Sequence, residues 1–226
     1  AGILNGTGTI AANGGAGGGG WGGAGGGSGG RIALYYTGGN YPVEDTDKVM
    51  ARGASGGTGY GGPGTIYLEQ RGVDDPQAGR VLADNNSANS RSAGLVEGTY
   101  TLKKIKLTRY GHLTALGIAG IVNVTESSAL TGDSSIPELT IEGTINLPEM
   151  VTVNGISLGI RGAHTGMSDL DVGVGGTQGG LVLYEKTWAH TNWNDHFIFG
   201  DVHFGANSRL TVNYGSITAY YAKPVT

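Results

Sequence analysis

A glycine tract between residues 14 and 30 constrains the fold of this chain more than any other feature. Thirteen of these seventeen residues are glycine, and Trp21 is the only large side chain among them. Each glycine loses more backbone freedom on ordering than alanine, by roughly 0.5–1 kcal/mol, so ordering the tract costs on the order of 10 kcal/mol, comparable to the net stability of a domain. We therefore expect the tract to be held flat against a rigid β-scaffold, where backbone approaches backbone and side chains would collide.

The overall composition argues against several classes of function. Only 14% of the 226 residues are charged, the net charge is −4, and lysine and arginine form no basic stripe, so no nucleic-acid partner is expected. There is no cysteine, which leaves out disulfides and thiolate metal sites. No apolar run reaches the roughly 18 residues that a membrane-spanning helix needs, so no membrane insertion is expected. Low charge with abundant Gly, Thr, Asn and Ser is typical of exported bacterial proteins and predicts an extracellular or cell-surface location.

Strand signals recur along the chain, and helix signals are nearly absent. The strands are short apolar alternations of three to five residues, separated by one or two turn residues. A weak internal repeat relates residues 138–147, 150–158 and 209–218, each of which reads as strand, polar corner, strand. Each coil of a solenoid buries its inner face by stacking on its neighbours. The pattern therefore predicts an all-β chain that folds as a parallel β-helix with long Gly-rich corner loops, with an antiparallel β-sandwich as the alternative.

We interpret residues 1–226 as a single β-helix domain. The chain opens abruptly at Ala1 and closes abruptly at Thr226, which we interpret as a fragment of a larger protein. The Gly-rich loop 14–30 would leave the coil at a corner, where an insertion costs little. Residues 160–226 are interpreted as a possible distinct C-terminal capping part.

Several Gly-rich motifs occur in a fixed order within the first 130 residues. They lie at residues 6–15, 26–34, 61–68 and 82–86. In this order they resemble a recurring segment of very large, secreted, adhesin-like bacterial surface proteins. The resemblance implies a right-handed parallel β-helix and supplies no catalytic residues. By composition, the tract also resembles the glycine-rich tip of some phage tail adhesins, in which polyproline-II segments pack side by side.

A polar-aromatic segment near the C-terminus carries the candidate binding residues. Two Trp, two His, two Asn and one Asp fall within residues 188–197, and such indoles and short hydrogen-bonding groups suit carbohydrate. The candidate glycan-binding residues are Tyr184, Trp188, Asn192, Trp193, Asp195 and His196, with Trp21 as a second platform. The alternative is that the segment is an irregular loop that caps the coil with buried indoles, and that Trp21 only anchors the tract.

No metal or cofactor is assigned from the sequence. The six-residue spacing of His190 and His196 fits no common zinc motif. Acidic clusters at residues 44–47 and 169–171 offer oxygen ligands for calcium, but neither the RTX nonapeptide nor the EF-hand loop is present, and solvated loops are the simpler interpretation. The G-x-G-x-x-G matches in the tract precede no helix, which argues against a dinucleotide.

These observations favour a non-catalytic adhesion or polysaccharide-binding module displayed on a bacterial surface, with a polysaccharide or cell-surface glycan as its partner. No catalytic residue is assigned. Two alternatives stay open. One is a polysaccharide-degrading enzyme, a lyase or glycoside hydrolase on a β-helix, for which Asp195 with Asp201, or Asp169 with Asp171, are suggestive carboxylate pairs. The other is a purely structural spacer. The oligomeric state is not indicated.

Overall fold

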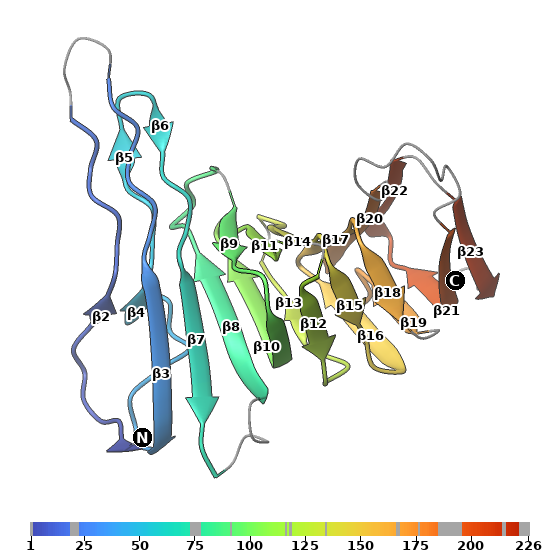
Figure 1. Cartoon of the computed structure of the whole chain (residues 1–226), viewed down its shortest axis with the longest axis horizontal. Coiled ribbons are helices and arrows are strands. Elements are labelled where there is room, and N and C mark those ends of the chain that lie inside the picture. The colour runs from blue at the N-terminus through green and yellow to red at the C-terminus, as the bar shows by residue number, and fades with distance from the viewer. Residues whose placement is uncertain are drawn as a thin grey trace.

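The structure is a computed structural model, and it contains strands but no helix among the residues that it describes (Figure 1). These are residues 2–18, 23–72, 78–90, 92–115, 117, 119–133, 135–165, 168–175, 177–184, 196–213 and 216–221. The all-β character expected from the short apolar alternations is confirmed. No described segment forms a helix long and apolar enough to cross a membrane.

Most strands beyond residue 78 stack in three ladders of parallel pairs. The first ladder contains β8 (Ala78–Asp84), β10 (Thr99–Thr108), β13 (Leu130–Thr131), β16 (Met150–Asn154), β19 (Asp169–Val172), β21 (His196–Phe204) and β23 (Ser216–Tyr221). The second contains β9 (Ala93–Leu95), β11 (Leu113–Ala115), β14 (Glu138–Ile141), β17 (Ser157–Ile160), β20 (Gln178–Tyr184) and β22 (Asn207–Asn213). The third runs from the first half of β10 through β12 (Ile121–Val124) and β15 (Thr144–Asn146) to β18 (Ala163–Thr165).

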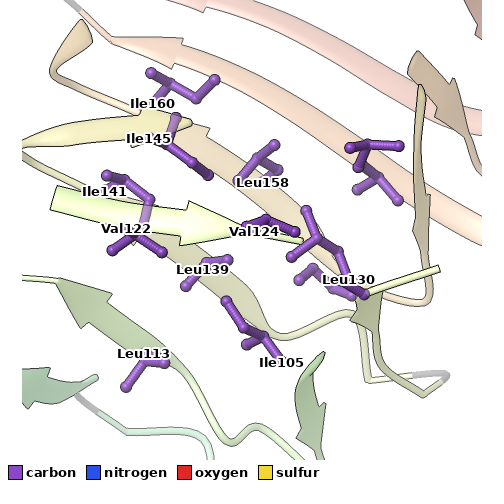
Figure 2. Close-up of a cluster of buried hydrophobic side chains, with 14 of the residues drawn as sticks. Ile105, Leu113, Val122, Val124, Leu130, Leu139, Ile141, Ile145, Leu158 and Ile160 are labelled. Carbon is purple, nitrogen blue, oxygen red and sulfur yellow. The ribbon is translucent and has the colours of Figure 1, made fainter. Parts of the chain in front are cut away.

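Register within each ladder places like residues above one another. Leu113 pairs with Leu139, Leu139 with Leu158, and Leu158 with Leu181, and all four side chains are fully buried. Figure 2 shows how leucine, isoleucine and valine side chains from the three ladders meet in one cluster. Because each fully buried Leu or Ile contributes about 1.5–3 kcal/mol of transfer free energy, this column is the main source of rigidity.

The predicted right-handed parallel β-helix is wrong, because the sheets mix parallel and antiparallel pairs. β7 (Thr65–Gln70) runs antiparallel to β8, and β5 (Ser55–Gly56) forms an antiparallel hairpin with β6 (Gly59–Tyr60). Only residues 71–77 join β7 to β8, whereas parallel neighbours need a crossover of a dozen or more residues. The alternative, an antiparallel β-sandwich, is wrong as well, since the ladders consist of parallel pairs.

The N-terminal part is a sheet with a core of its own. β1 (Gly2–Ile3) pairs with β3 (Arg31–Gly38), and β3 pairs with β7. Beside them, β2 (Ile10–Ala11) pairs with β4 (Val49–Met50). One face of this sheet packs on a cluster made of Tyr36, Val43, Val49, Ala51, Ile66, Leu68 and Leu82. The strand β8 belongs to both parts: Leu82 enters this cluster, while its neighbours Val81 and Ala83 enter the core of the ladders.

Two glycine-rich arms, residues 12–18 with 23–30 and residues 51–64, lie side by side and extend past the ends of β3 and β7 (Figure 1). We call them arm one and arm two. Their backbone hydrogen bonds recur every third residue, with donors at Gly14 and Gly17, Gly26 and Gly29, Gly27 and Gly30, and Gly61 and Gly64. Three residues per turn is the period of polyproline II. The tract thus pairs with itself and with a second glycine-rich segment, not with the flat wall expected from the sequence.

The same period governs where a side chain is forbidden. A Cβ on Gly14 would lie 1.9 Å from the carbonyl oxygen of Gly27, and one on Gly17 would lie 2.4 Å from that of Ala24. Gly53 and Gly56 in arm two face backbone at 2.0 and 2.3 Å in the same way. By contrast, a Cβ on Gly15 or Gly18 would meet nothing within 4 Å. Glycine is therefore required where backbone of the same arm or of the other arm lies alongside, and not at Gly15 or Gly18.

A buried carboxylate ties arm two to the ladders. The side chain of Asp84 is 1% exposed, and it accepts hydrogen bonds from Arg52 Nε at 2.8 Å and from Arg109 Nε at 2.6 Å. Arg52 belongs to arm two, and Arg109 directly follows β10. Because removing one partner of a buried charge pair is far more costly than removing an exposed one, this cluster fixes the arms relative to the ladders.

Candidate functional site

Most of the glycan-binding residues predicted from the sequence lie outside the described part of the chain. These are Trp21, Trp188, Asn192, Trp193 and Asp195. His196 begins β21, where its backbone pairs with Ser216, but its side chain is not among those described. Five of the seven predicted residues are therefore not placed relative to one another, and the polar-aromatic segment stays a prediction.

Tyr184 is described, and its side chain is engaged by its neighbours. The hydroxyl donates to Glu138 Oε1 at 2.7 Å, and the guanidinium carbon of Arg161 lies 4.3 Å from the ring centroid. Burial, together with the hydrogen bond to Glu138, raises the pKa of Tyr184 to about 12. Arg161, which follows β17, covers one face of the ring. The Tyr184 side chain therefore links β20 to β14 and to the end of β17.

The acidic clusters considered for calcium are paired with arginine, lysine and histidine side chains. Glu44 pairs with Arg80 and Lys104, each at 2.9 Å, and Asp171 Oδ1 lies 2.9 Å from His203 Nδ1. Burial raises the pKa of Glu44, but the hydrogen bonds and charges of Lys104 and Arg80 outweigh it and lower the pKa overall. Within the described ranges, no three His, Asp or Glu side chains gather closely enough to hold a metal ion.

A groove of about 590 Å³ opens where the N-terminal sheet meets the first strands of the ladders. Three tyrosines line it: Tyr35 on β3, Tyr67 on β7 and Tyr100 on β10. Its floor is apolar and includes Val81 and Leu102, both buried. We call it the tyrosine groove. Its size is that of a typical small-ligand site, roughly 300–1,000 Å³.

The alternation of β3 and β7 directs the tyrosines into this groove. On β3, Tyr36 is buried in the N-terminal core, while its neighbour Tyr35 is 46% exposed. Successive side chains of a strand point to opposite faces, so Tyr35 shares the groove face with Arg31, four residues before it. Across the parallel pair, Tyr35 stands opposite Glu69, and Ala33 stands opposite Tyr67.

Gly79 provides the seat for the ring of Tyr67. A Cβ at Gly79 would lie 2.2–2.4 Å from three atoms of that side chain, so the ring lies where any larger residue would have its side chain. The rings of Tyr35 and Tyr67 are 5.7 Å apart between centroids and tilted by 53°, within the range of favourable aromatic pairs. The Tyr100 hydroxyl donates to the Val96 carbonyl at 2.8 Å. Two of the three rings thus have a fixed backbone support.

The Glu69 carboxylate and the Arg71 guanidinium contact two of the rings. Tyr67 donates its hydroxyl proton to Glu69 Oε2 at 3.0 Å, and Arg71 Nε lies 3.2 Å from Glu69 Oε1. The same guanidinium is 5.1 Å from the centroid of Tyr35. Glu69 is the one carboxylate among the described residues that line the groove, and its charge is balanced by Arg71.

A second hollow of about 160 Å³ adjoins the groove. It is lined by backbone-rich segments of residues 28–30, 63–65 and 92–94. Arg31 and Thr65 line both hollows. Arg31 reaches from β3 toward β9, where its Nη2 donates to the Gly94 carbonyl at 3.2 Å. The two hollows together form a path that runs from the tyrosines to the base of the arms.

The binding residues predicted from the sequence did not include those of this groove. The available signal is the pair Tyr35-Tyr36, since one member of an alternating pair must face away from the core it shares. That signal shows that a tyrosine is turned outward, but not that Tyr67 and Tyr100 come beside it. Their meeting depends on the antiparallel pairing of β7 with β8.

Comparison with known proteins finds no matching family model, no matching curated relative and no matching solved structure.

Proposed function

We propose that this protein is a non-catalytic polysaccharide-binding module and that the tyrosine groove holds the sugar chain. The observation that carries the proposal is the gathering of Tyr35, Tyr67 and Tyr100 over an apolar floor. Pyranose rings have an apolar face that stacks on aromatic rings, and their hydroxyls need hydrogen-bonding groups at the rim. The groove offers both kinds of surface.

The rigidity of the groove supports binding of an extended chain. The ring of Tyr67 packs on Gly79, and the hydroxyl of Tyr100 is bonded to the Val96 carbonyl. Groups that are already ordered lose little conformational entropy on binding. Binding is proposed rather than hydrolysis because a glycosidase needs two carboxylates across the scissile bond, and Glu69 is the only one that lines the groove in the described part of the chain.

The setting of the module is part of the proposal. Low charge, the lack of cysteine and the abundance of glycine fit an extracellular adhesion protein on a bacterial surface, with a polysaccharide or cell-surface glycan as its partner. The aromatic segment around Trp188 and Trp193 is a second surface to be tested separately.

The experiment is calorimetric titration of the full chain with a panel of soluble neutral and acidic polysaccharides. Substituting Tyr35→Ala and Tyr100→Ala together removes two aromatic platforms of about 1 kcal/mol each, so affinity should fall about tenfold or more. Tyr60→Ala is the matched control, since Tyr60 is 58% exposed on β6 and lines neither hollow.

Two results would overturn the proposal. One is that no polysaccharide binds, which would favour a structural spacer. The other is that binding survives the double tyrosine substitution but is lost on Trp188→Ala with Trp193→Ala, which would move the site to the C-terminal segment.

A further inference from the structure

Arg31 occupies the junction of the two hollows and has no acidic partner there. Of the described arginines in this part of the chain, Arg52 and Arg109 pair with Asp84, Arg80 pairs with Glu44, and Arg71 pairs with Glu69. Arg31 forms no ion pair with any described residue, and the one hydrogen bond of its side chain to the described part of the chain is the 3.2 Å contact to the Gly94 carbonyl. A guanidinium carries five N–H donors, so four of them have no hydrogen-bond partner among the described residues.

The charges of the groove are separated along its length. Arg31 and Tyr35 lie on the same face of β3, and Glu69 stands opposite Tyr35. Four residues of extended chain span roughly 13 Å, so the free guanidinium and the Glu69 carboxylate lie at different ends. Glu69 is balanced by Arg71, and therefore does not repel an anion held near Arg31.

We infer that the tyrosine groove takes an acidic polysaccharide, with the carboxylate of a uronic acid unit on Arg31 and the following sugar rings on the tyrosines. The inference rests on the proposed function and names its substrate class. The planar guanidinium fork matches a carboxylate with two parallel N–H···O bonds. The carboxylate replaces the weak bond to Gly94, while the backbone-lined hollow beyond Arg31 gives the chain room to continue.

The net negative charge of the protein means that an acidic polysaccharide must be recognised by individual side chains in the groove. The net charge is −4, so a polyanion is not drawn to the molecule as a whole. Binding of an acidic polysaccharide must then depend on the cationic side chains at the two hollows. Among the described ones, Arg31 is the one without a carboxylate partner. We therefore expect Arg31 alone to decide between the acid and the neutral form of one polysaccharide.

The test compares two forms of one polysaccharide, polygalacturonate and its fully methyl-esterified form, each titrated into the 226-residue protein. The wild type should bind the acid form about tenfold more tightly, since hydrogen bonds between charged groups are the strong ones. Arg31→Gln should lower the affinity for the acid to about that for the ester, and Arg31→Lys should keep part of the preference, because lysine retains the charge without the fork.

Arg209→Gln is the matched control, because Arg209 is an exposed arginine on β22, far along the ladders from the groove. An unchanged thermal midpoint for Arg31→Gln shows that the fold is intact. Equal binding of acid and ester by the wild type, or a preference that survives Arg31→Gln, would overturn the inference while leaving the groove as a neutral glycan site. If neither form nor any neutral polysaccharide binds, the proposed function itself fails.

Discussion

At the scale of single residues, His112 shows how burial in this fold becomes pH dependence. Its Nδ1 accepts the backbone N–H of Glu138 at 2.9 Å. Burial lowers the pKa of His112 below its ordinary 6.5, and the nearby charge of Glu138 only partly opposes this. Protonation would turn the acceptor into a second donor and break the bond that joins β11 to β14. The folded state therefore holds this imidazole neutral.

The first prediction concerns His112→Asn, whose amide oxygen can accept the same N–H. Because the folded pKa lies below 6.5, the unfolded chain binds a proton before the folded chain does. The stabilising effect of His112 is fully present above pH 6.5 and is lost as the pH falls below that value. Urea unfolding from pH 8 to 5 should show the free energy of unfolding of the wild type falling relative to that of the variant as the pH falls. A difference that stays constant across this range would contradict the account.

Residue-scale features of the site were only partly predictable from the sequence. The alternation in residues 31–36 shows that one of two adjacent tyrosines faces outward. The sequence around Gly79 does not show that the Tyr67 ring fills the space beside this glycine. That contact depends on the antiparallel pairing of β7 with β8, which the local sequence does not reveal.

At the scale of elements, the two arms explain how a glycine tract can be ordered. Backbone hydrogen bonds join the segments within each arm and also join the two arms, and close backbone neighbours exclude a Cβ at a three-residue period. The entropy lost by the glycines is offset by backbone bonds that larger residues could not reach. The sequence indicated this need for close approach, but not that residues 51–64 meet it, since their mixture of Gly, Ser, Thr and Pro is also typical of a turn region.

The second prediction compares two adjacent glycines of arm one. Gly14→Ala places a methyl group 1.9 Å from the Gly27 carbonyl oxygen, so it should lower the free energy of unfolding by about 1–3 kcal/mol or more through overpacking. Gly15→Ala enters open space and should be neutral or stabilising by up to about 1 kcal/mol, because it restricts the unfolded chain. Urea unfolding of both variants measures the contrast, and equal destabilisation would show that the arms do not pack as described.

At the scale of the whole molecule, one strand couples two cores. β8 pairs antiparallel with β7 and parallel with β10, and its consecutive residues Val81 and Leu82 face different cores. The tyrosine groove lies at this transition. The repeat in the sequence predicted stacked strands, but it could not locate the point where the chain reverses direction, because a period of two looks the same in parallel and antiparallel strands.

The third prediction compares substitutions at two adjacent residues of β8, each of which packs in a different core. Leu82→Ala should cost about 2–5 kcal/mol as a buried large-to-small change, and it should accelerate amide hydrogen exchange in β3, β4 and β7. Val81→Ala, its neighbour, should act instead on the ladder strands β10, β13 and β16. Exchange that rises uniformly across both parts in either variant would show one undivided core.

The most direct measurement of the central claim is a crystal structure of the full chain with a bound oligogalacturonate. The account predicts sugar rings over Tyr35, Tyr67 and Tyr100, with one carboxylate within hydrogen-bonding distance of the Arg31 guanidinium. An oligosaccharide seated against Trp188 and Trp193, or on any other face while the tyrosine groove stays empty, would contradict it.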